Sequence, residues 1–472
     1  MEDIVKQISK EKFNSYVALT IQPEAHFFCE EIYWVANKSE TILGTVLFDK
    51  SDNDFSAVLL GCDERKQFRC FEHEVGFNTP QDALLWLRIK IEQQTHKGHF
   101  YYPQGDHIKE QNLDLFKDVV PEDKQHPYYK LLKYNKVWAS AKKYISNIMC
   151  SYSDIDGNFV EQFQSEGFEQ RLWELYLFMC FKEEKLKVDR NYQHPDFIVM
   201  SGENIIGIEA VTVSRKTKIS AYQNLFNPSG SKSFPVLTDK ILHNDMPIMW
   251  GSSLYTKLTH TVKKEPKNPT NNERIHYWEL PYLRGKPFII AIQDFHDDFS
   301  MTWSFNSLIE CLYGYKSFSY YENNQLKNKL QKIDKFLKKT GISIPAGFFC
   351  SPDANNISAV IASPLGTLSK FNRMGKQAGF DSSNTTMMRF GLCHNKESNL
   401  PVSFKYNVGD DNTHKETWTE GLSIFHNPNA TYPVPAHLFP NAAHHYLKNE
   451  QIVSSVPNFM PYNSYTLNVI GE

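Results

Sequence analysis

The fold is decided by residues 168–216, which read FEQRLWELYLFMCFKEEKLKVDRNYQHPDFIVMSGENIIGIEAVTVSRK. The first third has the composition of a packed helix. Two short apolar runs follow, at 196–200 and 205–213, and the turn sequence SGEN separates them. Because Gly202 permits a tight turn, the pattern predicts an antiparallel hairpin directly after the helix. On either side of this segment, residues 155–370 alternate helix-like and strand-like patterns, which indicates an α/β domain.

The register of this hairpin brings two acids together. If Met200 faces Ile205 across the turn, Asp196 stands directly opposite Glu209. Opposed residues of an antiparallel pair have Cβ atoms about 4.5 to 5.5 Å apart, and like charges there are destabilising. The remaining strand residues are nearly all apolar, so water cannot easily screen the pair. We therefore expect a cation between the two carboxylates, with Mg²⁺ or Mn²⁺ as the candidate.

The preceding helix offers two more acids, and helical geometry separates them. Glu169 lies on the same side of the helical wheel as the large apolar side chains, whereas Glu174 falls about 140° away, beside Arg171. Glu169 is therefore expected to face the packed side and to point into the site. Glu174 is expected to pair with Arg171 on a less buried face.

The order of a helix glutamate, Pro-Asp and a second acid in the next strand resembles the PD-(D/E)XK nuclease superfamily, which has the restriction-endonuclease-like fold. Pro195 and Asp196 match the PD, Glu209 matches the (D/E), and Glu169 matches the acid of the first helix. The resemblance covers roughly residues 165–300. It implies a Mg²⁺-dependent endonuclease that hydrolyses DNA phosphodiester bonds, with Asp196, Glu209 and Glu169 as metal ligands. It also suggests a bacterial restriction or antiviral defence effector.

The chain departs from that family at one position, because Val211 stands where the family has a catalytic lysine. In such nucleases this lysine orients or helps to deprotonate the attacking water. Lys216, Lys218 and Lys257 are candidates to replace it from neighbouring elements. Two alternatives stay open. The protein is a catalytically lapsed nuclease-fold protein that binds nucleic acid or a protein partner, or a scaffold whose opposed acids bind a structural cation or a protein.

Charge distribution supports a nucleic-acid partner, with DNA as the expected substrate and RNA as the open alternative. The chain of 472 residues has a formal net charge of only −3. However, residues 215–286 contain twelve Lys or Arg against five Asp or Glu, as a phosphodiester substrate requires. The alternative is a solvated lysine-rich loop. Residues 326–339 (LKNKLQKIDKFLKK) predict an amphipathic helix that either packs on one side or contacts the DNA backbone.

Two further clusters of polar residues are candidate sites. Residues 286–296 predict a buried strand with Asp294 and His296 at its carboxyl end, where α/β sheets place ligands. Near the C-terminus, the spacing of the polar residues fits neither a zinc finger nor a compact nuclease metal unit, and turn chemistry explains the sequence HNPN. These residues are His426, Asn427, Asn429, His444 and His445.

The expected organisation has four parts: an N-terminal β-meander plus helix module (1–110), a helical connector (111–154), the mixed-sheet nuclease core (155–370) and a loop-rich C-terminal β region (371–472). The first and last parts would supply target or protein-partner recognition. The longest purely apolar run, 175–181, is too short to span a membrane, and the first residues do not resemble a secretory signal. Together with scattered cysteines that form no CxxC pair, this predicts a cytoplasmic protein with free, buried thiols.

Overall fold

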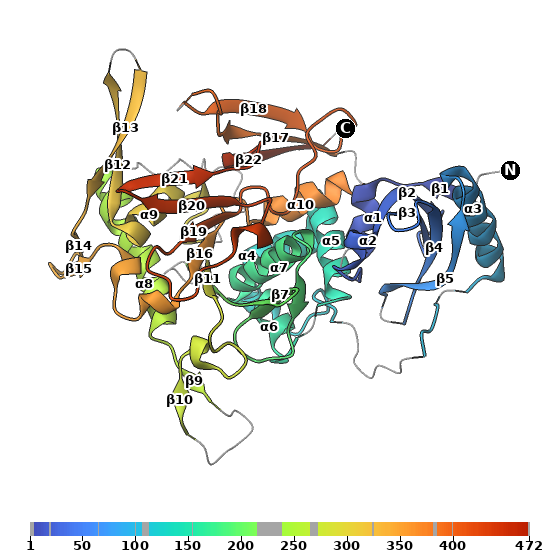
Figure 1. Cartoon of the computed structure of the whole chain (residues 1–472), viewed down its shortest axis with the longest axis horizontal. Helices are drawn as coiled ribbons and strands as arrows, with labels where there is room; N and C mark the ends of the chain where they lie inside the picture. Colours follow the sequence, from blue (N-terminus) through green and yellow to red (C-terminus); the bar gives the residue numbers. More distant parts are fainter. Residues whose placement is uncertain are drawn as a thin grey trace.

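The computed structural model describes residues 4–17, 20–64, 66–99, 101–105, 113–152, 154–214, 238–264, 272–322, 325–380, 385–398 and 400–470. The chain is a mixed α/β protein with several sheets, the largest of which has eight strands (Figure 1). No helix among these residues is both long and apolar enough to cross a membrane. Lys216, Lys218 and the first part of the basic stretch lie outside the described residues.

The N-terminal module is an antiparallel sheet covered by one long helix. Its strands follow the order β1-β2-β3-β4-β5, with bounds Val5–Gln7, Cys29–Asn37, Ile42–Asp49, Phe55–Cys62 and Phe68–Phe77. Helix α3 (Pro80–Lys97) begins where Thr79 Oγ1 accepts the N–H of Asp82, with Pro80 in the first turn. The predicted meander of β3 to β5 and its following helix are confirmed. The edge strands β1 and β2 and the short helices α1 (Lys10–Val17) and α2 (Ala25–Phe28) complete the module.

The centre of the molecule is an eight-stranded mixed sheet with the order β21-β20-β19-β16-β11-β8-β7-β6. From β6 to β21 the strands span Lys187–Asp189, Phe197–Ser201, Asn204–Val213, Phe288–Asp294, Ala359–Ala362, Ser423–His426, Ala443–Lys448 and Gln451–Ser455. Strand β11 runs parallel to β8 and β16, whereas β7 is antiparallel to β8, and β19 to β16. The sheet therefore continues past residue 370 into the C-terminal region.

Helices cover both faces of this sheet. One face carries α4 (Pro127–Tyr134), α5 (Ala139–Met149), α6 (Phe159–Gln164), α7 (Phe168–Glu183) and α10 (Leu368–Gln377), and the other carries α8 (Met246–Leu258) and α9 (Phe305–Tyr313) (Figure 1). Because both faces of the sheet are covered, alternate side chains of β11 pack into different hydrophobic cores. Ile289 and Ala291 belong to the core shared with α7, while Ile290 and Ile292 belong to the core shared with α8 and α9.

Smaller sheets project from this centre. Three hairpins are formed by β9 (Val262–Lys263) with β10 (Arg274–Ile275), β12 (Tyr315–Glu322) with β13 (Gln325–Lys332), and β14 (Lys335–Leu337) with β15 (Ser343–Pro345). A three-stranded sheet has the order β18 (Val402–Asn407), β17 (Thr385–Cys393) and β22 (Pro461–Ile470).

The helix predicted over 326–339 is wrong, because these residues form β13 and β14. The segment just before them, YKSFSYYE, is rich in strand-forming aromatic side chains and pairs with β13 along its whole length, from Tyr315↔Lys332 to Glu322↔Gln325. The apolar spacing of residues 326–337 suits a helix, but this pairing overrides it.

Candidate active site

The hairpin of β7 and β8 has the expected register, with Met200 paired to Ile205 and Phe197 to Ile208. Asp196 immediately precedes β7, so it comes to lie beside Glu209. Its backbone N–H donates to Glu209 Oε2 over 3.3 Å, and its own Oδ2 accepts the N–H of Ala210 over 2.8 Å. The two carboxylates predicted to oppose one another are thus neighbours in the structure.

A lysine from a different element forms an ion pair with Glu209 of this acidic pair. Lys257, in the last turn of α8, places its Nζ 2.6 Å from Glu209 Oε1, and Tyr277 donates its hydroxyl to the same oxygen over 2.9 Å. Glu209 is 4% exposed. Burial alone would lower the pKa of Lys257, but the charges of Glu209 and Asp196 outweigh burial and raise it. One of the three candidate lysines therefore reaches the site, in its charged form.

Strand alternation explains why the lysine comes from α8. Ile208 and Ala210 pack in the core beside α7, so the side chain of Glu209 points to the opposite face of the sheet, where α8 lies. Tyr277 follows β10 and lies 68 residues from Glu209 in the chain. Nothing local in the sequence indicates that Tyr277 belongs to the site.

Helix α7 brings Glu174 within electrostatic reach of Asp196. This side chain is 1% exposed and accepts two hydrogen bonds from Arg171 Nη1, at 3.0 and 2.9 Å, and one from Tyr152 over 3.2 Å. Gln170 Nε2 bridges Glu174 and the carbonyl of Ala210, at 3.2 and 3.4 Å. The predicted pairing of Glu174 with Arg171 is confirmed. The less buried face predicted for Glu174 is wrong, because α7 is enclosed on nearly all sides.

Glu169 is buried in the first turn of α7, in agreement with the packed side predicted for it. Among the described residues, however, no group of three or more His, Cys, Asp or Glu side chains is placed to hold one metal ion. Within that part of the chain, Glu169 thus does not complete a three-acid cluster with Asp196 and Glu209.

The electrostatics of the site favour an additional cation. Burial raises the pKa of Asp196 well above its usual range, and the negative charges of Glu209 and Glu174 raise it further, against the opposing effect of Lys257. Asp196 remains partly exposed, and no hydrogen bond to its Oδ1 is formed within the described residues. Two carboxylates fit Mg²⁺, which is commonly held by one or two carboxylates together with waters and substrate phosphate.

The remaining candidates lie elsewhere. Asp294 ends β11 as predicted and is 1% exposed, with its Oδ1 2.7 Å from His296 Nδ1. It pairs with Val213, whereas Glu209 pairs with Ile290 on the same strand, so four residues separate the two acids along the sheet. His426 and His444 form a buried pair between β19 and β20. Asn427 Oδ1 accepts the N–H of Asn429 within the turn, and its Nδ2 donates to the carbonyls of Ala354 and Ile357.

Comparison with known proteins adds no assignment. No protein-family model matches the chain, and neither a curated protein nor a solved structure matches it.

Proposed function

We propose that this protein is a Mg²⁺-dependent endonuclease with a restriction-endonuclease-like core that hydrolyses DNA phosphodiester bonds. The observation that carries the proposal is the meeting of Asp196, Glu209 and Lys257, which come from a hairpin and a helix 48 residues apart in the chain. Lys257 would perform the role of the family's catalytic lysine, whose position is occupied by Val211 in this chain. On the resemblance alone, we further propose a role in bacterial antiviral defence.

The residues of the site have distinct roles in this proposal. Lys257 is held charged by Glu209, close to where a scissile phosphate would bind, and can orient an attacking water and offset negative charge. Tyr277 fixes the Glu209 carboxylate. A Mg²⁺ or Mn²⁺ ion held by Asp196 and Glu209 would supply a water of lowered pKa and stabilise charge on the phosphate.

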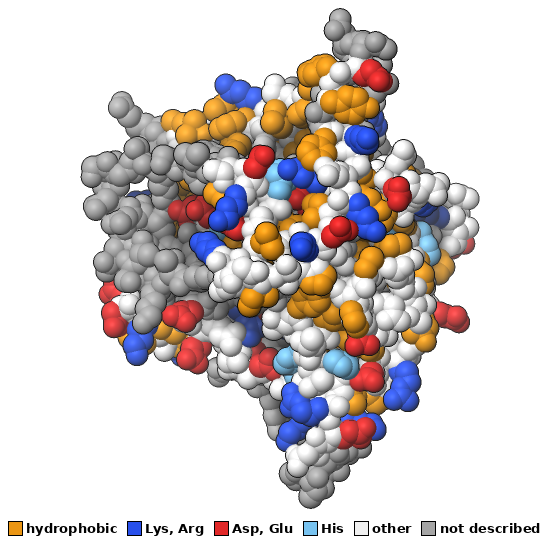
Figure 2. All heavy atoms as spheres, turned by 90° about the vertical axis from the view of Figure 1, so that its left-hand side faces the viewer, with side chains coloured by type: hydrophobic (Ala, Val, Ile, Leu, Met, Phe, Trp, Pro, Cys, Tyr) orange, Lys and Arg blue, Asp and Glu red, His pale blue; other side chains and the backbone are white. Residues whose placement is uncertain are grey.

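The β9–β10 hairpin, which follows α8 in the chain, supports a polyanionic substrate. Lys263 and Arg274 are exposed and pair directly in register. Like charges in this arrangement repel one another unless an anion lies between them. Figure 2 shows Lys, Arg and His side chains together with Asp and Glu side chains at the lower protrusion of this face, where Figure 1 places β9 and β10. A DNA phosphate would relieve the repulsion.

The β12–β13 hairpin offers a second contact. Lys316, Phe318, Tyr320 and Lys329 lie on one face, because alternate residues of a strand and their cross-strand partners share a face. Phe318 and Tyr320 are 40% and 42% exposed. Exposed aromatic rings among lysines suit both base stacking and phosphate contact, and Figure 2 shows the two kinds of side chain interspersed on the upper protrusion.

Cleavage of supercoiled plasmid, single-stranded DNA and RNA with Mg²⁺ or Mn²⁺ tests the proposal. We expect Asp196→Ala and Lys257→Met each to reduce the rate by at least about 100-fold. Lys240→Met, which removes an exposed lysine just before α8, should leave the rate unchanged. Equal activity of folded Asp196→Ala and wild type would refute the site. RNA cleavage alone would exclude the DNA substrate.

The lapsed-nuclease alternative also has an observation in its favour. Glu209 Oε1 is already occupied by Lys257 and Tyr277, as expected if an internal ammonium has replaced a metal ion. In that case no nucleic acid would be cleaved, whereas salt-dependent binding would persist and weaken in Lys263→Met and Lys329→Met. A scaffold holding a structural cation would instead show a large loss of thermal stability in EDTA.

A further inference from the structure

A cavity of about 980 Å³ lies at the junction between the N-terminal module and the helical layer of the core. One wall comes from α1, α2 and the module's strands, and the other from α7, α10 and residues 415–418. The lining is mainly apolar and includes Phe13, Val17, Leu47, Leu60, Met179 and Trp418. Cavities of roughly 300 to 1,000 Å³ with apolar walls and a few polar groups are typical of small-molecule sites.

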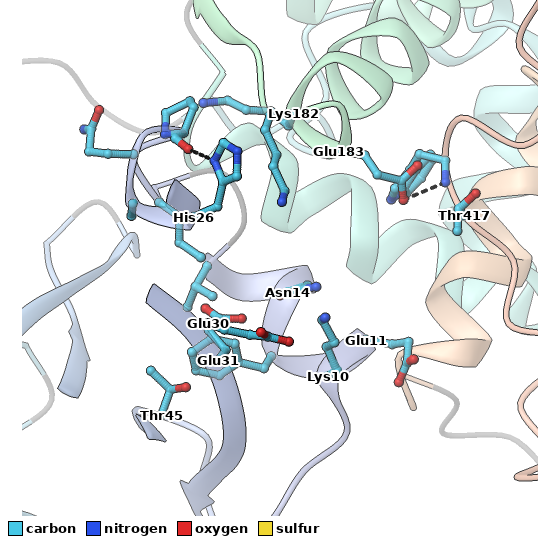
Figure 3. Close-up of a pocket in the computed structure, with 18 of the residues that line it drawn as sticks. Lys10, Glu11, Asn14, His26, Glu30, Glu31, Thr45, Lys182, Glu183 and Thr417 are labelled. Carbon is cyan, nitrogen blue, oxygen red and sulfur yellow. Dashed lines mark hydrogen bonds between the residues drawn. The ribbon is translucent and has the colours of Figure 1, made fainter. Parts of the chain in front are cut away.

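Lys182 is a lining residue whose charge a bound anion would neutralise. It is mostly buried, and within the described residues it forms no ion pair or hydrogen bond; its Nζ lies 6.0 Å from the centre of the Phe178 ring. Burial lowers the pKa of Lys182 because no carboxylate compensates it. Figure 3 shows Lys182 on the core side of the cavity, facing Lys10 and Asn14 of α1.

Thr45 is a second group without a partner. It lies on β3, is 3% exposed and lines the cavity (Figure 3). Its Oγ1 is buried, and no described residue forms a hydrogen bond with it. An unsatisfied buried hydroxyl costs free energy unless a ligand or a water completes it.

The buried acids of the lining are already engaged and cannot serve Lys182. Glu183 accepts the backbone N–H groups of Trp418 and Thr419 over 2.9 and 2.7 Å. Glu416 is paired with Arg373 over 2.7 Å and with Lys370 over 2.8 Å. Glu31 lies within electrostatic reach of Lys10, whose charge opposes the rise that burial causes in the pKa of Glu31. Of the lysines that line the cavity in the described part of the chain, Lys182 is the one whose pKa burial lowers, and no ion pair or hydrogen bond offsets that burial.

We propose that this cavity binds a small organic anion, with its carboxylate, phosphate or sulfonate facing Lys182, its apolar body against Phe13, Met179 and Trp418, and an acceptor for Thr45. A neutral apolar molecule would leave Lys182 uncompensated. A bare inorganic anion would leave the apolar walls unfilled. The proposal is independent of the nuclease proposed above, because it uses none of Asp196, Glu209 and Lys257.

Titration of the full chain with the fluorescent anion 8-anilinonaphthalene-1-sulfonate tests this site. We expect Lys182→Met to weaken binding about tenfold and Lys182→Arg to restore it, because a charge-assisted contact is lost and regained. Lys97→Met, at the exposed end of α3, is the matched control and should bind as wild type does. Leu47→Trp, which fills part of the cavity, should abolish saturable binding in a chain whose folding is checked by circular dichroism.

Competition of other compounds with the fluorescent probe identifies the chemical class of the ligand. Dodecanoate and dodecyl phosphate should displace the probe, and their relative affinities distinguish a carboxylate from a phosphate ligand. Dodecanol and inorganic phosphate should displace it at least about tenfold less well. Equal binding by wild type and Lys182→Met, or equal competition by dodecanol, would overturn the proposal.

Discussion

The negative charge of Asp196 is poorly compensated by its surroundings. Lys257 supplies one ammonium to two neighbouring carboxylates, and Arg171 is engaged with Glu174. A partly buried carboxylate beside a second one is unfavourable for folding unless a cation is added. Such local instability is common at functional sites, where a binding group is kept at some cost in stability.

The raised pKa of Asp196 gives a stability prediction with a definite sign. Burial and the charges of Glu209 and Glu174 raise it, so above the ordinary aspartate pKa the unfolded chain binds fewer protons than the native chain. Stability therefore falls as pH rises through the native pKa. We expect Asp196→Asn, which keeps an acceptor for the N–H of Ala210, to be more stable than wild type at pH 8 by at least about 0.5 kcal/mol.

Urea denaturation in EDTA at pH 5 and pH 8 measures this difference. The gain should shrink at pH 5, and Mg²⁺ should stabilise wild type but not Asp196→Asn. A variant less stable than wild type at pH 8 would show that the Asp196 charge is well compensated after all.

Among the individual residues of the site, the sequence predicted those of the hairpin better than those that surround it. The opposition of Asp196 and Glu209 follows from strand register and a two-residue turn, which are local. The position of Glu174 depends on how α7 is enclosed by α5, α6 and the sheet, and a helical wheel contains no such information. Tyr277 could not be found because only tertiary packing brings it to Glu209.

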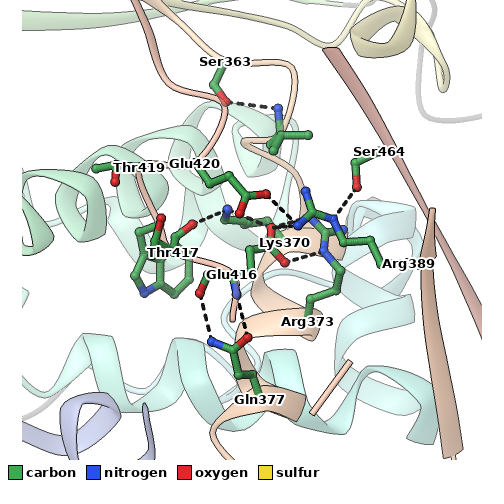
Figure 4. Close-up of polar contacts among 12 residues, drawn as sticks. Ser363, Lys370, Arg373, Gln377, Arg389, Glu416, Thr417, Thr419, Glu420 and Ser464 are labelled. Carbon is green, nitrogen blue, oxygen red and sulfur yellow. Dashed lines mark hydrogen bonds and ion pairs between the residues drawn. The ribbon is translucent and has the colours of Figure 1, made fainter. Parts of the chain in front are cut away.

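Among the elements, α10 and β17 are joined through a buried ionic network (Figure 4). Glu416, 1% exposed at its side chain, binds Arg373 Nε over 2.7 Å and Lys370 Nζ over 2.8 Å, and Arg389 Nη1 lies 3.4 Å away. Arg389 is also bound to Glu420 over 2.6 Å. The network attaches the three-stranded sheet to the helical layer, since Arg373 and Arg389 bond Thr466 and Ser464 of β22.

We expect Glu416→Gln to lower the free energy of unfolding by about 3 to 5 kcal/mol, because it leaves buried cations without a counter-charge. Glu397→Gln, an exposed position after β17, is the control and should change stability by less than about 0.5 kcal/mol. Chemical denaturation at neutral pH compares the two. A small effect of Glu416→Gln would mean that Glu420 alone can balance the cations.

The strands β19 and β20 are joined by two histidines whose proton positions follow from their partners. His444 Nε2 lies 2.9 Å from the carbonyl of Phe439, which can only accept, so this nitrogen carries a proton. His444 Nδ1 then accepts from His426 Nε2 over 2.9 Å. Protonation of His444 Nδ1 would set two donors against each other.

This pair predicts acid sensitivity. Burial, followed by the charge of His444, lowers the pKa of His426 from 6.5 to about 4. Between these values the unfolded chain binds more protons than the native chain, so stability falls as pH drops, by at most about 3 kcal/mol for this residue. His426→Gln, which keeps a donor to His444, should flatten the decline in urea denaturation midpoints between pH 6.5 and 4.5. An unchanged slope would exclude His426 as its source.

Elements whose structure is determined by their own sequence were predictable, whereas elements determined by tertiary pairing were not. The hairpin of β7 and β8 has two apolar runs and a glycine turn within its own seventeen or so residues, so its pattern suffices. Residues 326–339 have helical spacing, yet pairing with the preceding aromatic strand decides their structure. Short apolar repeats are ambiguous until their partners are known.

For the whole molecule, the central sheet makes the C-terminal region part of the core. Every residue of β16 (Ala359–Ala362) is fully buried, and β19 pairs with it along its length. By contrast, the N-terminal module has its own hydrophobic core and meets the rest through α1, where Tyr16 packs edge-on against Phe380. The central sheet therefore requires the C-terminal region in order to fold, whereas it does not require the N-terminal module.

Two truncations test this asymmetry. The fragment 155–370 lacks β19, which leaves β16 as an unpaired apolar edge, so we expect it to aggregate or to unfold without cooperativity. The fragment 113–472 keeps the whole sheet, α4, α5 and the Asp196–Glu209–Lys257 site, and should fold and retain any nuclease activity. Because it lacks one wall of the junction cavity, it should also lose saturable binding of the anionic probe. Solubility, circular dichroism and the two assays measure these outcomes, and cooperative unfolding of 155–370 would show that the core ends before the C-terminal strands.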